Sequence, residues 1–263
     1  MTTININTGE NVDLLVFPDG QPHVKVKGVA PFSRVKVVCS ITDTVKLIQL
    51  LEVSDAILRL SGIRHRLVIP YLMGARYDRE MIPGSGESVD LQVIANLINS
   101  MNFEEVYLYD VHSSAATQLI SRSTNLPNHS LVMQYTKDDA VLICPDKGAK
   151  ARVPEYVKWN KNLTDVVYCD KTRDMANGNI TLTVLDPEKC KGRNCVIIDD
   201  LCDGGGTFLS IASQIDPAHL TLIVTHGIFS KGLVPLEQHF DEIIVSSSYK
   251  PSYDSPKVKV ITY

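Results

Sequence analysis

One segment, Cys195 to Thr207 (CVIIDDLCDGGGT), joins an apolar run, three carboxylates and three consecutive glycines. Its first four residues, Cys195 to Ile198, are typical of a strand buried in a parallel sheet, and open α/β sheets bind ligands at the carboxyl ends of such strands. The glycines let backbone N–H groups face an anion, and a helix predicted over Phe208 to Ile215 would direct its N-terminus there. Carboxylates here suit sugar hydroxyls, directly or through a metal. We therefore expect a sugar-phosphate site made of Asp199, Asp200, Asp203, Gly204, Gly205, Gly206 and Thr207.

An ordinary strand-to-helix turn is the simpler interpretation of the same segment. Asp203 or Thr207 would then cap the helix, but a cap accounts for one acid and not for three. The segment lacks the lysine of a GxxxxGK[ST] loop and the spacing of a GxGxxG loop, so these two nucleotide motifs are excluded. It resembles the ribose-phosphate loop of the phosphoribosyltransferase-type fold, which phosphoribosyltransferases share with ribose-phosphate pyrophosphokinases (PRPP synthetases). The loop alone leaves open whether the protein makes or uses PRPP.

A second segment, Ile69 to Arg79 (IPYLMGARYDR), places two guanidinium groups in a short loop after a predicted strand. Arginine binds phosphate oxygens through a planar, bidentate fork. Taken alone, this could be a solvated basic loop in which Asp78 pairs with one arginine. The segment resembles the IPYxxxARQDR sequence with which PRPP synthetases bind ATP. The resemblance implies an ATP site that includes Arg76, Tyr77 and Arg79.

Three shorter segments follow the order of the same family. Phe17 to Gln21 (FPDGQ) resembles the FxDGE loop that reaches the adenine, often from a neighbouring subunit, which implies ATP-binding roles for Phe17, Asp19 and Gln21. The DVH sequence ending at His112 resembles the family's DLH segment, whose histidine serves the metal-bound nucleotide. The CPDKG sequence around Asp146 resembles the SPD segment that supplies a metal carboxylate. The resemblance thus implies Mg²⁺ bound with ATP by His112 and Asp146.

The segment Asp170 to Arg173 (DKTR) separates the two enzyme classes best. It resembles the family's flexible catalytic loop, in which a lysine and an arginine close over the transferring diphosphate. Diphosphate transfer depends on charge stabilisation and in-line positioning. The resemblance implies catalytic roles for Lys171 and Arg173, together with His112. A phosphoribosyltransferase would need only a solvated basic turn here.

These segments predict Mg²⁺-dependent transfer of diphosphate from ATP to the anomeric 1-hydroxyl of ribose 5-phosphate, which gives AMP and PRPP for nucleotide biosynthesis. One departure from the family favours another acceptor. Gly204 stands where the family's DTAGT-like loop has threonine, so a hydroxyl donor is lost and space opens beside the 5-phosphate. ADP-ribose is therefore an alternative acceptor, as proposed for some viral relatives, and would place the protein in NAD metabolism. A PRPP-using phosphoribosyltransferase and a non-catalytic regulatory homologue are further alternatives.

The predicted ATP and metal segments also depart from the family's sequence at four positions. Gln21 replaces the glutamate of the adenine loop, Tyr77 replaces a glutamine, Glu80 stands where a basic residue is usual, and Lys147 replaces a small residue or histidine. The resemblance implies a homo-oligomer, either a dimer or a hexamer built from dimers.

The elements that position these segments alternate along the chain as in βαβ units. The predicted fold is α/β, with two phosphoribosyltransferase-type (Rossmann-like) domains that have parallel-sheet cores. A polar stretch before His129 divides the chain into residues 1–125, an ATP-binding domain, and residues 126–263, a ribose-phosphate-binding domain. Predicted strands cover residues 34–39, 66–71, 106–110, 140–144, 166–170, 181–185, 194–199, 220–225, 242–246 and 257–262, and predicted helices cover residues 44–60 and 88–101.

Composition limits the remaining function classes. The 263 residues carry a formal net charge of -4, which argues against bulk nucleic-acid binding. The chain shows neither a leader pattern nor an apolar run long enough for a membrane span, so we expect a soluble, cytoplasmic protein, in the host cytoplasm if the origin is viral. Its six cysteines form no CxxC pair, which predicts reduced thiols. Cys202 is expected to be a small filler of the loop, although a thiol beside a helix N-terminus can have a lowered pKa.

Overall fold

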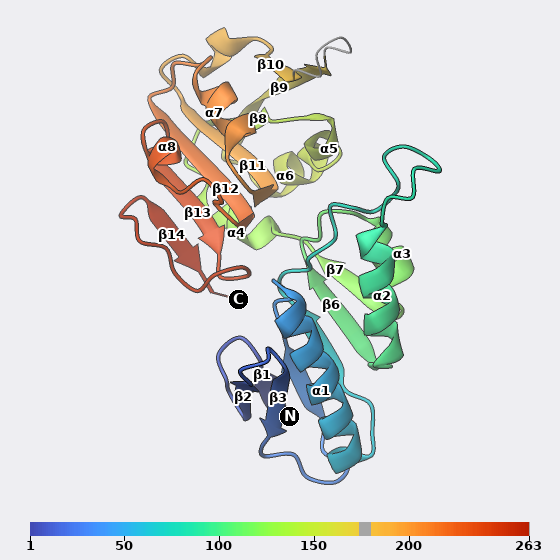
Figure 1. Cartoon of the computed structure of the whole chain (residues 1–263). Helices are drawn as coiled ribbons and strands as arrows, with labels where there is room; N and C mark the ends of the chain where they lie inside the picture. The colour runs from blue at the N-terminus through green and yellow to red at the C-terminus, as the bar shows by residue number, and fades with distance from the viewer. Residues whose placement is uncertain (174–179, 263) are drawn as a thin grey trace. The chain divides into compact units, whose positions relative to one another are not determined.

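A computed structural model describes residues 1–173 and 180–262. The chain divides into two compact units, Met1–Pro127 and Asn128–Tyr263, each with its own sheet (Figure 1). The domain boundary expected between residues 125 and 126 falls near the end of the last strand of the N-terminal unit.

The N-terminal unit is built on a five-stranded, fully parallel sheet in the order β1-β4-β5-β6-β7. A separate hairpin of β2 and β3 packs against α1. The strands are β1 (Thr2–Asn5), β2 (Val12–Val16), β3 (Pro22–Val26), β4 (Val35–Val38), β5 (Arg66–Ile69), β6 (Glu105–Tyr109) and β7 (Ser123–Leu126), and the helices are α1 (Thr44–Ser61), α2 (Asp90–Ser100) and α3 (Ala115–Leu119).

Helix α1 shows how local sequence determines an element of this unit. It begins after Asp43, whose carboxylate accepts the Lys46 N–H at 2.9 Å, and it ends at Gly62, which takes the left-handed conformation (φ 73°). Leu50 and Val53 are among the residues that it buries in the core. The predicted helix over residues 44–60 therefore has the correct start and ends one residue early.

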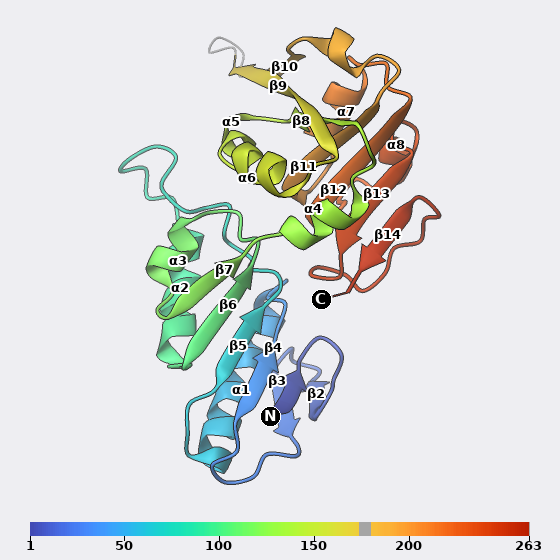
Figure 2. The same cartoon turned by 180° about the vertical axis from the view of Figure 1, so that it is seen from behind.

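The two faces of the N-terminal sheet are covered unequally. Along β4, β5 and β6, fully buried residues alternate with half-buried ones. Leu67 and Leu108 belong to the single hydrophobic core of this unit, whereas Val68 and Tyr107 lie side by side on the opposite face and remain partly exposed. Figure 2 shows strands β4 to β7 in front of α1 and α2 when the chain is seen from behind.

The C-terminal unit has a seven-stranded sheet in the order β10-β9-β8-β11-β12-β13-β14. All neighbours pair in parallel except β9 and β10, which are antiparallel at one edge. The strands are β8 (Ala140–Cys144), β9 (Leu163–Arg173), β10 (Ile180–Val184), β11 (Asn194–Cys202), β12 (His219–Gly227), β13 (Glu242–Ser246) and β14 (Val258–Ile261), and the helices are α4 (His129–Tyr135), α5 (Lys147–Lys150), α6 (Val153–Trp159), the 3-10 helix η1 (Pro187–Cys190), α7 (Gly206–Ala212) and α8 (Val234–Glu237).

This second sheet is buried on both faces. Ile197 and Val224 lie in one hydrophobic cluster, and their neighbours Ile198 and Ile223 lie in another. Successive residues of a strand point to opposite faces, so the two clusters cover the two sides of the sheet. Parallel cores in both units agree with the predicted α/β architecture.

Several regions differ from the sequence-based expectation. The DKTR segment, expected to be a flexible loop, continues β9 as far as Arg173, because its backbone pairs with the β-branched strand β10. Strands β1, β2, β3 and β7 were not predicted. The polar stretch that suggested the domain boundary contains β7, which pairs with β6 despite its polar sequence STNL.

His65 links the first sheet to the end of α1 and should make stability depend on pH. Its ring is 4% exposed; Nδ1 accepts the Val35 N–H at 3.2 Å, and Nε2 lies 2.7 Å from the Ser61 hydroxyl. Burial lowers the pKa of His65 below its usual 6.5. Below that pH the unfolded chain gains a proton that the folded protein does not accept, so the free energy of unfolding should fall as the pH drops from 7.5 to 5.

His65→Gln should weaken this dependence. We expect the variant to be less stable at pH 7.5 by about 1–2 kcal/mol, because buried hydrogen bonds are lost, and to lose less further stability on acidification. Urea unfolding at a series of pH values measures both effects. His239→Gln, at an exposed histidine, is the control and should keep the wild-type slope. Parallel pH profiles for wild type and His65→Gln would show that His65 is not the titrating group.

Candidate active site

The glycine-rich loop of the C-terminal unit connects β11 to α7. Gly205 precedes α7 in the left-handed conformation (φ 75°, ψ 0°), and a Cβ atom there would lie 3.0 Å from Cδ2 of Leu236. A glycine is therefore required at 205 by the backbone and by packing. Gly206 is exposed and Thr207 is half-buried in the first turn of the helix. The segment forms the strand-turn-helix predicted from the sequence.

Gly204 has a different reason to be glycine. Its φ lies outside the left-handed region, but a Cβ atom there would lie 3.2 to 3.4 Å from Cγ, Cδ and Cε of Lys231. The expectation that Gly204 opens space beside the phosphate is wrong, because the methylenes of Lys231 lie in that space. Gly204 still lacks the hydroxyl donor that a threonine would supply at this position.

A second loop, residues 228–232 after β12, is attached to the glycine loop through the backbone. The N–H groups of Ile228 and Phe229 donate to the carbonyl oxygen of Cys202 at 2.9 and 3.2 Å, and the Ser230 N–H donates to the carbonyl oxygen of Asp203 at 3.1 Å. These bonds hold Lys231 next to Gly204. No sequence pattern marked Lys231, because the contact joins two segments that only the fold brings together.

The paired carboxylates lie at the carboxyl end of β11. Asp199 Oδ1 accepts the backbone N–H of Asp200 at 2.9 Å. The pKa of the Asp199 carboxyl is raised well above its usual value, mainly by burial and then by the charge of Asp200, with a smaller contribution from Asp146. The structure thus brings Asp146 close enough to Asp199 for their charges to interact.

Arg152 is a cation of this site that the sequence analysis missed. Its Nη2 lies 3.4 Å from Oδ1 of Asp200, whose side chain is only 7% exposed. The guanidinium partly offsets the charge that two adjacent carboxylates would otherwise bring into the sheet. The spacing of Arg152 from the acidic pair gave no signal, since the residues meet only through the fold.

Asp146 and Lys171 also lie on the C-terminal unit. Asp146 Oδ1 accepts the Ala149 N–H at 2.9 Å and so caps the short helix α5. Lys171 is exposed on β9, where its backbone pairs with Leu182 of β10. Arg173 pairs in the same ladder through its backbone with Ile180, and its side chain falls outside the described part of the chain.

In the N-terminal unit, the two predicted ATP segments meet through one aspartate. Asp78 Oδ2 accepts a hydrogen bond from the Ser113 hydroxyl at 2.6 Å, and Oδ1 lies 3.9 Å from Nε of Arg79. Ser113 directly follows His112, which is exposed. The arginine loop after β5 and the histidine loop after β6 therefore come together at the carboxyl edge of the first sheet, and Arg76 and Tyr77 are also exposed there.

The predicted adenine loop is the tip of the β2–β3 hairpin. The Phe17 N–H donates to the carbonyl oxygen of Gln21 at 2.8 Å, and Asp19 Oδ1 accepts the Gln21 N–H at 3.1 Å. All residues of the tip are exposed, and the Phe17 side chain is 42% exposed. Because hydrogen bonds within the turn fix its shape, the tip presents Phe17 as an available stacking surface.

The oxygen and nitrogen ligands predicted for Mg²⁺ can be compared with the ligands that this ion prefers. Mg²⁺ prefers oxygen ligands and usually keeps several waters, so one or two carboxylates suffice for a site that also uses substrate phosphates. Asp146 and Asp199, whose charges interact, fit this preference. Within residues 1–173 and 180–262, no group of three or more His, Cys, Asp or Glu side chains has the arrangement of a protein-only metal site. His112 and Asp146 belong to different units.

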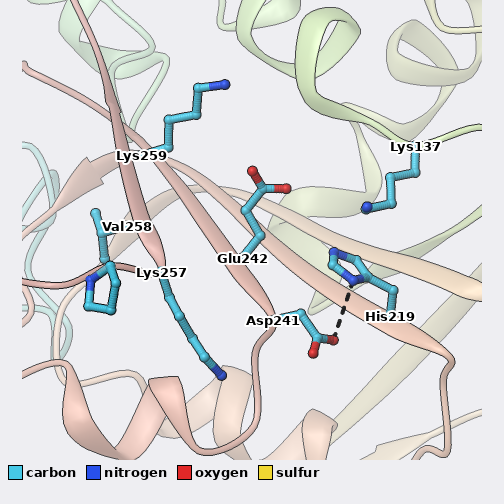
Figure 3. A pocket seen from close by; sticks show the side chains of 8 residues that line it. Lys137, His219, Asp241, Glu242, Lys257, Val258 and Lys259 are labelled. Carbon is cyan, nitrogen blue, oxygen red and sulfur yellow. Dashed lines mark ion pairs between the residues drawn. The ribbon is translucent and has the colours of Figure 1, made fainter.

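A separate hollow of about 500 Å³ lies at the amino-terminal ends of β12, β13 and β14 (Figure 3). Its walls carry both charge signs, and His219 Nδ1 lies 3.7 Å from Oδ2 of Asp241. Burial, together with the charge of Lys137, lowers the pKa of His219. The predicted ribose-phosphate residues follow the opposite, carboxyl half of β11, and none of the predicted site residues lines this hollow.

The thiols of the cysteines are all enclosed in the protein. All six are free and buried. Burial raises the pKa of the Cys202 thiol to about 12, so the helix that follows does not activate it. None of the helices in the described residues is both long and apolar enough to span a membrane.

Comparisons with known proteins agree with one another. The family of phosphoribosyl transferase domains matches residues 128–244. The ribose-phosphate pyrophosphokinase of Hyphomonas neptunium is 28% identical over 226 residues, which cover 82% of this chain and 71% of the relative. That of Thermococcus kodakarensis is 24% identical over 253 residues, which cover 90% and 85%. Among solved structures, the phosphoribosylpyrophosphate synthetase from Mycobacterium smegmatis has the same fold, with a TM-score of 0.79 and 21% identity over 95% of this chain and 85% of that chain.

The raised pKa of Asp199 gives a test of the carboxylate pair. A buried carboxyl whose folded pKa lies above its unfolded value reduces stability as the pH rises from the unfolded pKa to the folded pKa. Asp199→Asn should therefore raise the free energy of unfolding at pH 8, by on the order of 1 kcal/mol, while lowering enzymatic turnover. The gain should disappear toward pH 4. Chemical unfolding without divalent cations measures it, and Asp138→Asn, at an exposed aspartate, is the control. Equal or lower stability of Asp199→Asn at pH 8 would contradict the prediction.

Proposed function

The chain belongs to the ribose-phosphate pyrophosphokinase family, and we propose that it transfers the diphosphate of ATP to the 1-hydroxyl of ribose 5-phosphate. The observation that carries the proposal is the carboxyl half of β11, where the adjacent carboxylates Asp199 and Asp200 lie shortly before the glycine loop. The names of the curated relatives add support for synthesis of PRPP over its use by a phosphoribosyltransferase. They also weigh against a non-catalytic regulatory homologue.

In the proposed reaction, the oxygen of the anomeric hydroxyl forms a bond to the β-phosphorus of ATP. The bond from that phosphorus to the oxygen shared with the α-phosphorus breaks, AMP leaves with that oxygen, and the hydroxyl proton is released. Asp199 and Asp200 bind the ribose hydroxyls, and the backbone from Asp203 to Thr207 binds the 5-phosphate. This arrangement fixes the 1-hydroxyl relative to the sheet, and proximity of this kind provides much of the rate enhancement of a transfer reaction.

The ATP half of the proposal uses residues of the N-terminal unit. Arg76 and Arg79 bind the phosphates, and Tyr77 contributes to the same loop. Phe17 stacks on the adenine, with Asp19 and Gln21 as polar partners. The hydrogen bond from Ser113 to Asp78 supports this assignment, because it ties the arginine loop to the loop of His112. The hairpin tip is exposed, which suits a loop that serves a neighbouring subunit.

Catalysis is assigned to Lys171, Arg173 and His112. Lys171 is exposed and its backbone is fixed in the β9–β10 ladder, so its ammonium is available to a diphosphate. Asp146, with help from Asp199, would hold Mg²⁺, and His112 would serve the metal-bound nucleotide; the bound metal would neutralise charge on the ATP phosphates. The protein's own cations neutralise the charge on the diphosphate as it moves.

The loop at Gly204 supports a second acceptor, ADP-ribose, in which the phosphate on C5 of the ribose is joined through an anhydride to a second phosphate. Without a threonine side chain the loop offers one hydroxyl donor fewer to a phosphate monoester. The product would be an ADP-ribose pyrophosphate of NAD metabolism. Ribose 5-phosphate remains the first candidate, because the relatives are ribose-phosphate pyrophosphokinases.

Assembly and location complete the proposal. We expect a homo-oligomer, either a dimer or a hexamer built from dimers, and light scattering would determine its mass. The half-exposed face of the first sheet supports assembly, because Val68 and Tyr107 there lack the cover that the second sheet has on both faces.

Six buried, reduced cysteines support action in a reducing compartment such as the cytoplasm.

A direct assay tests the reaction and the acceptor together. The protein is incubated with Mg-ATP and either ribose 5-phosphate or ADP-ribose, and AMP formation and product mass are followed. We expect AMP and a product heavier than ribose 5-phosphate by one diphosphate. The same mass gain on ADP-ribose alone would assign the second acceptor, and absence of AMP with both acceptors would contradict the proposed function.

Lys171→Ala tests the catalytic assignment. The variant should lose turnover by at least about 100-fold with little change in the KM values, because the ammonium acts on charge that develops in the transition state. Its melting temperature should stay within about 2 °C of wild type, since the side chain is exposed. Steady-state kinetics and thermal unfolding measure these effects. Lys161→Ala, at another exposed lysine of the same unit, should retain full activity. Unchanged turnover in Lys171→Ala would remove Lys171 from the mechanism.

A further inference from the structure

The side chain of Lys231 lies directly over the glycine loop. Three of its carbons, Cγ, Cδ and Cε, come within 3.2 to 3.4 Å of the position that a Cβ atom on Gly204 would occupy. Its ammonium is one bond beyond Cε, so it lies next to the loop that faces the acceptor. The backbone hydrogen bonds from Ile228, Phe229 and Ser230 to Cys202 and Asp203 fix the loop that carries this lysine.

The charges of this region require a cation. The acceptor's phosphate must approach three carboxylates, Asp199, Asp200 and Asp203, and Arg152 lies beside Asp200. Lys231 is the one basic residue in the two loops, residues 203–207 and 228–232. Backbone N–H groups can orient a phosphate, but they carry no net charge to balance the nearby acids.

We propose that Lys231 binds the phosphate attached to C5 of the ribose acceptor, and that Gly204 is glycine so that this lysine can lie over the loop. This inference rests on the proposed function, because it concerns the acceptor of the same reaction. A lysine ammonium offers three donors and a full charge, whereas a threonine hydroxyl offers one donor. The ligand class is a ribose with a phosphate on C5, either a free monoester, as in ribose 5-phosphate, or a phosphate that forms one end of a diphosphate, as in ADP-ribose.

Lys231→Met is the first test, since methionine keeps a long apolar side chain over Gly204 and removes the charge. We expect Kd for ribose 5-phosphate or ADP-ribose, measured by calorimetry without ATP, to rise by about 10- to 100-fold. In turnover assays the acceptor KM should rise by a similar factor, while the ATP KM and kcat change less than about threefold. Lys231→Arg should restore most of the affinity. Lys191→Met, at an exposed lysine of the same unit, is the matched control and should bind as wild type does.

A double-mutant cycle tests the pairing with Gly204. Gly204→Ala should leave the melting temperature unchanged, because the flexible lysine can shift by a few tenths of an ångström, but it should weaken acceptor binding by moving the ammonium. In a Lys231→Ala background, which lacks the three contacting carbons, the same Gly204→Ala change should have no further effect on Kd.

The binding measurement separates this inference from the proposed function. If neither acceptor is turned over but ribose 5-phosphate or ADP-ribose binds and Lys231→Met weakens that binding, the lysine assignment holds and the reaction is wrong. If the enzyme is active and Lys231→Met binds both acceptors as wild type does, the reaction stands and the role of Lys231 is overturned. The same conclusion about Lys231 follows if neither acceptor binds to the wild-type protein. The acceptor whose Kd rises more identifies the phosphate that the lysine contacts.

Discussion

The candidate acceptor site depends on a strand that is hydrogen-bonded on both sides. Strand β11 lies between β8 and β12, and its residues from Cys195 to Ile198 are buried on both faces of the sheet. Such a strand cannot shift or fray without a loss of hydrogen bonds and core packing. The close-packed core therefore holds the carboxyl end of β11 in one position. That rigidity allows two adjacent carboxylates to be kept at one point, although burial and mutual repulsion disfavour their charged forms.

The same strand also organises the loops at its end. The carbonyl oxygens of Cys202 and Asp203 accept N–H groups from the loop after β12, so the glycine loop and its neighbour form one hydrogen-bonded unit. A ligand loop that depended on its own turn alone would have more freedom than one attached to the next strand's loop. The glycines contribute differently to this unit: Gly205 allows a left-handed backbone, and Gly204 allows a side chain from another loop to lie close.

How much the sequence could predict follows from the range of the interactions. The strands β8 and β13 were predicted with their observed bounds, because each contains a continuous apolar run next to polar turns, and the start of α1 was also predicted correctly. Strand β7 was missed because its polar sequence STNL carries no strand signal, and only pairing with β6 makes it a strand. The DKTR segment was assigned as a loop by resemblance, whereas its pairing with β10 makes it part of a strand.

The candidate site shows the same division. Asp199, Asp200 and the glycines could be found because they lie together in the chain, and the arginine and histidine segments because they follow predicted strands. Arg152 and Lys231 could not be found, since each approaches the acidic loop from a distant segment through tertiary contacts.

Both are cations beside a cluster of acids, and electrostatics explains why the site needs them. A site that uses carboxylates for sugar hydroxyls must still admit a phosphate, so positive charge has to come from outside the acidic segment. When an acidic ribose-phosphate motif is found in a sequence, basic residues should therefore also be sought on the loops that follow the neighbouring strands.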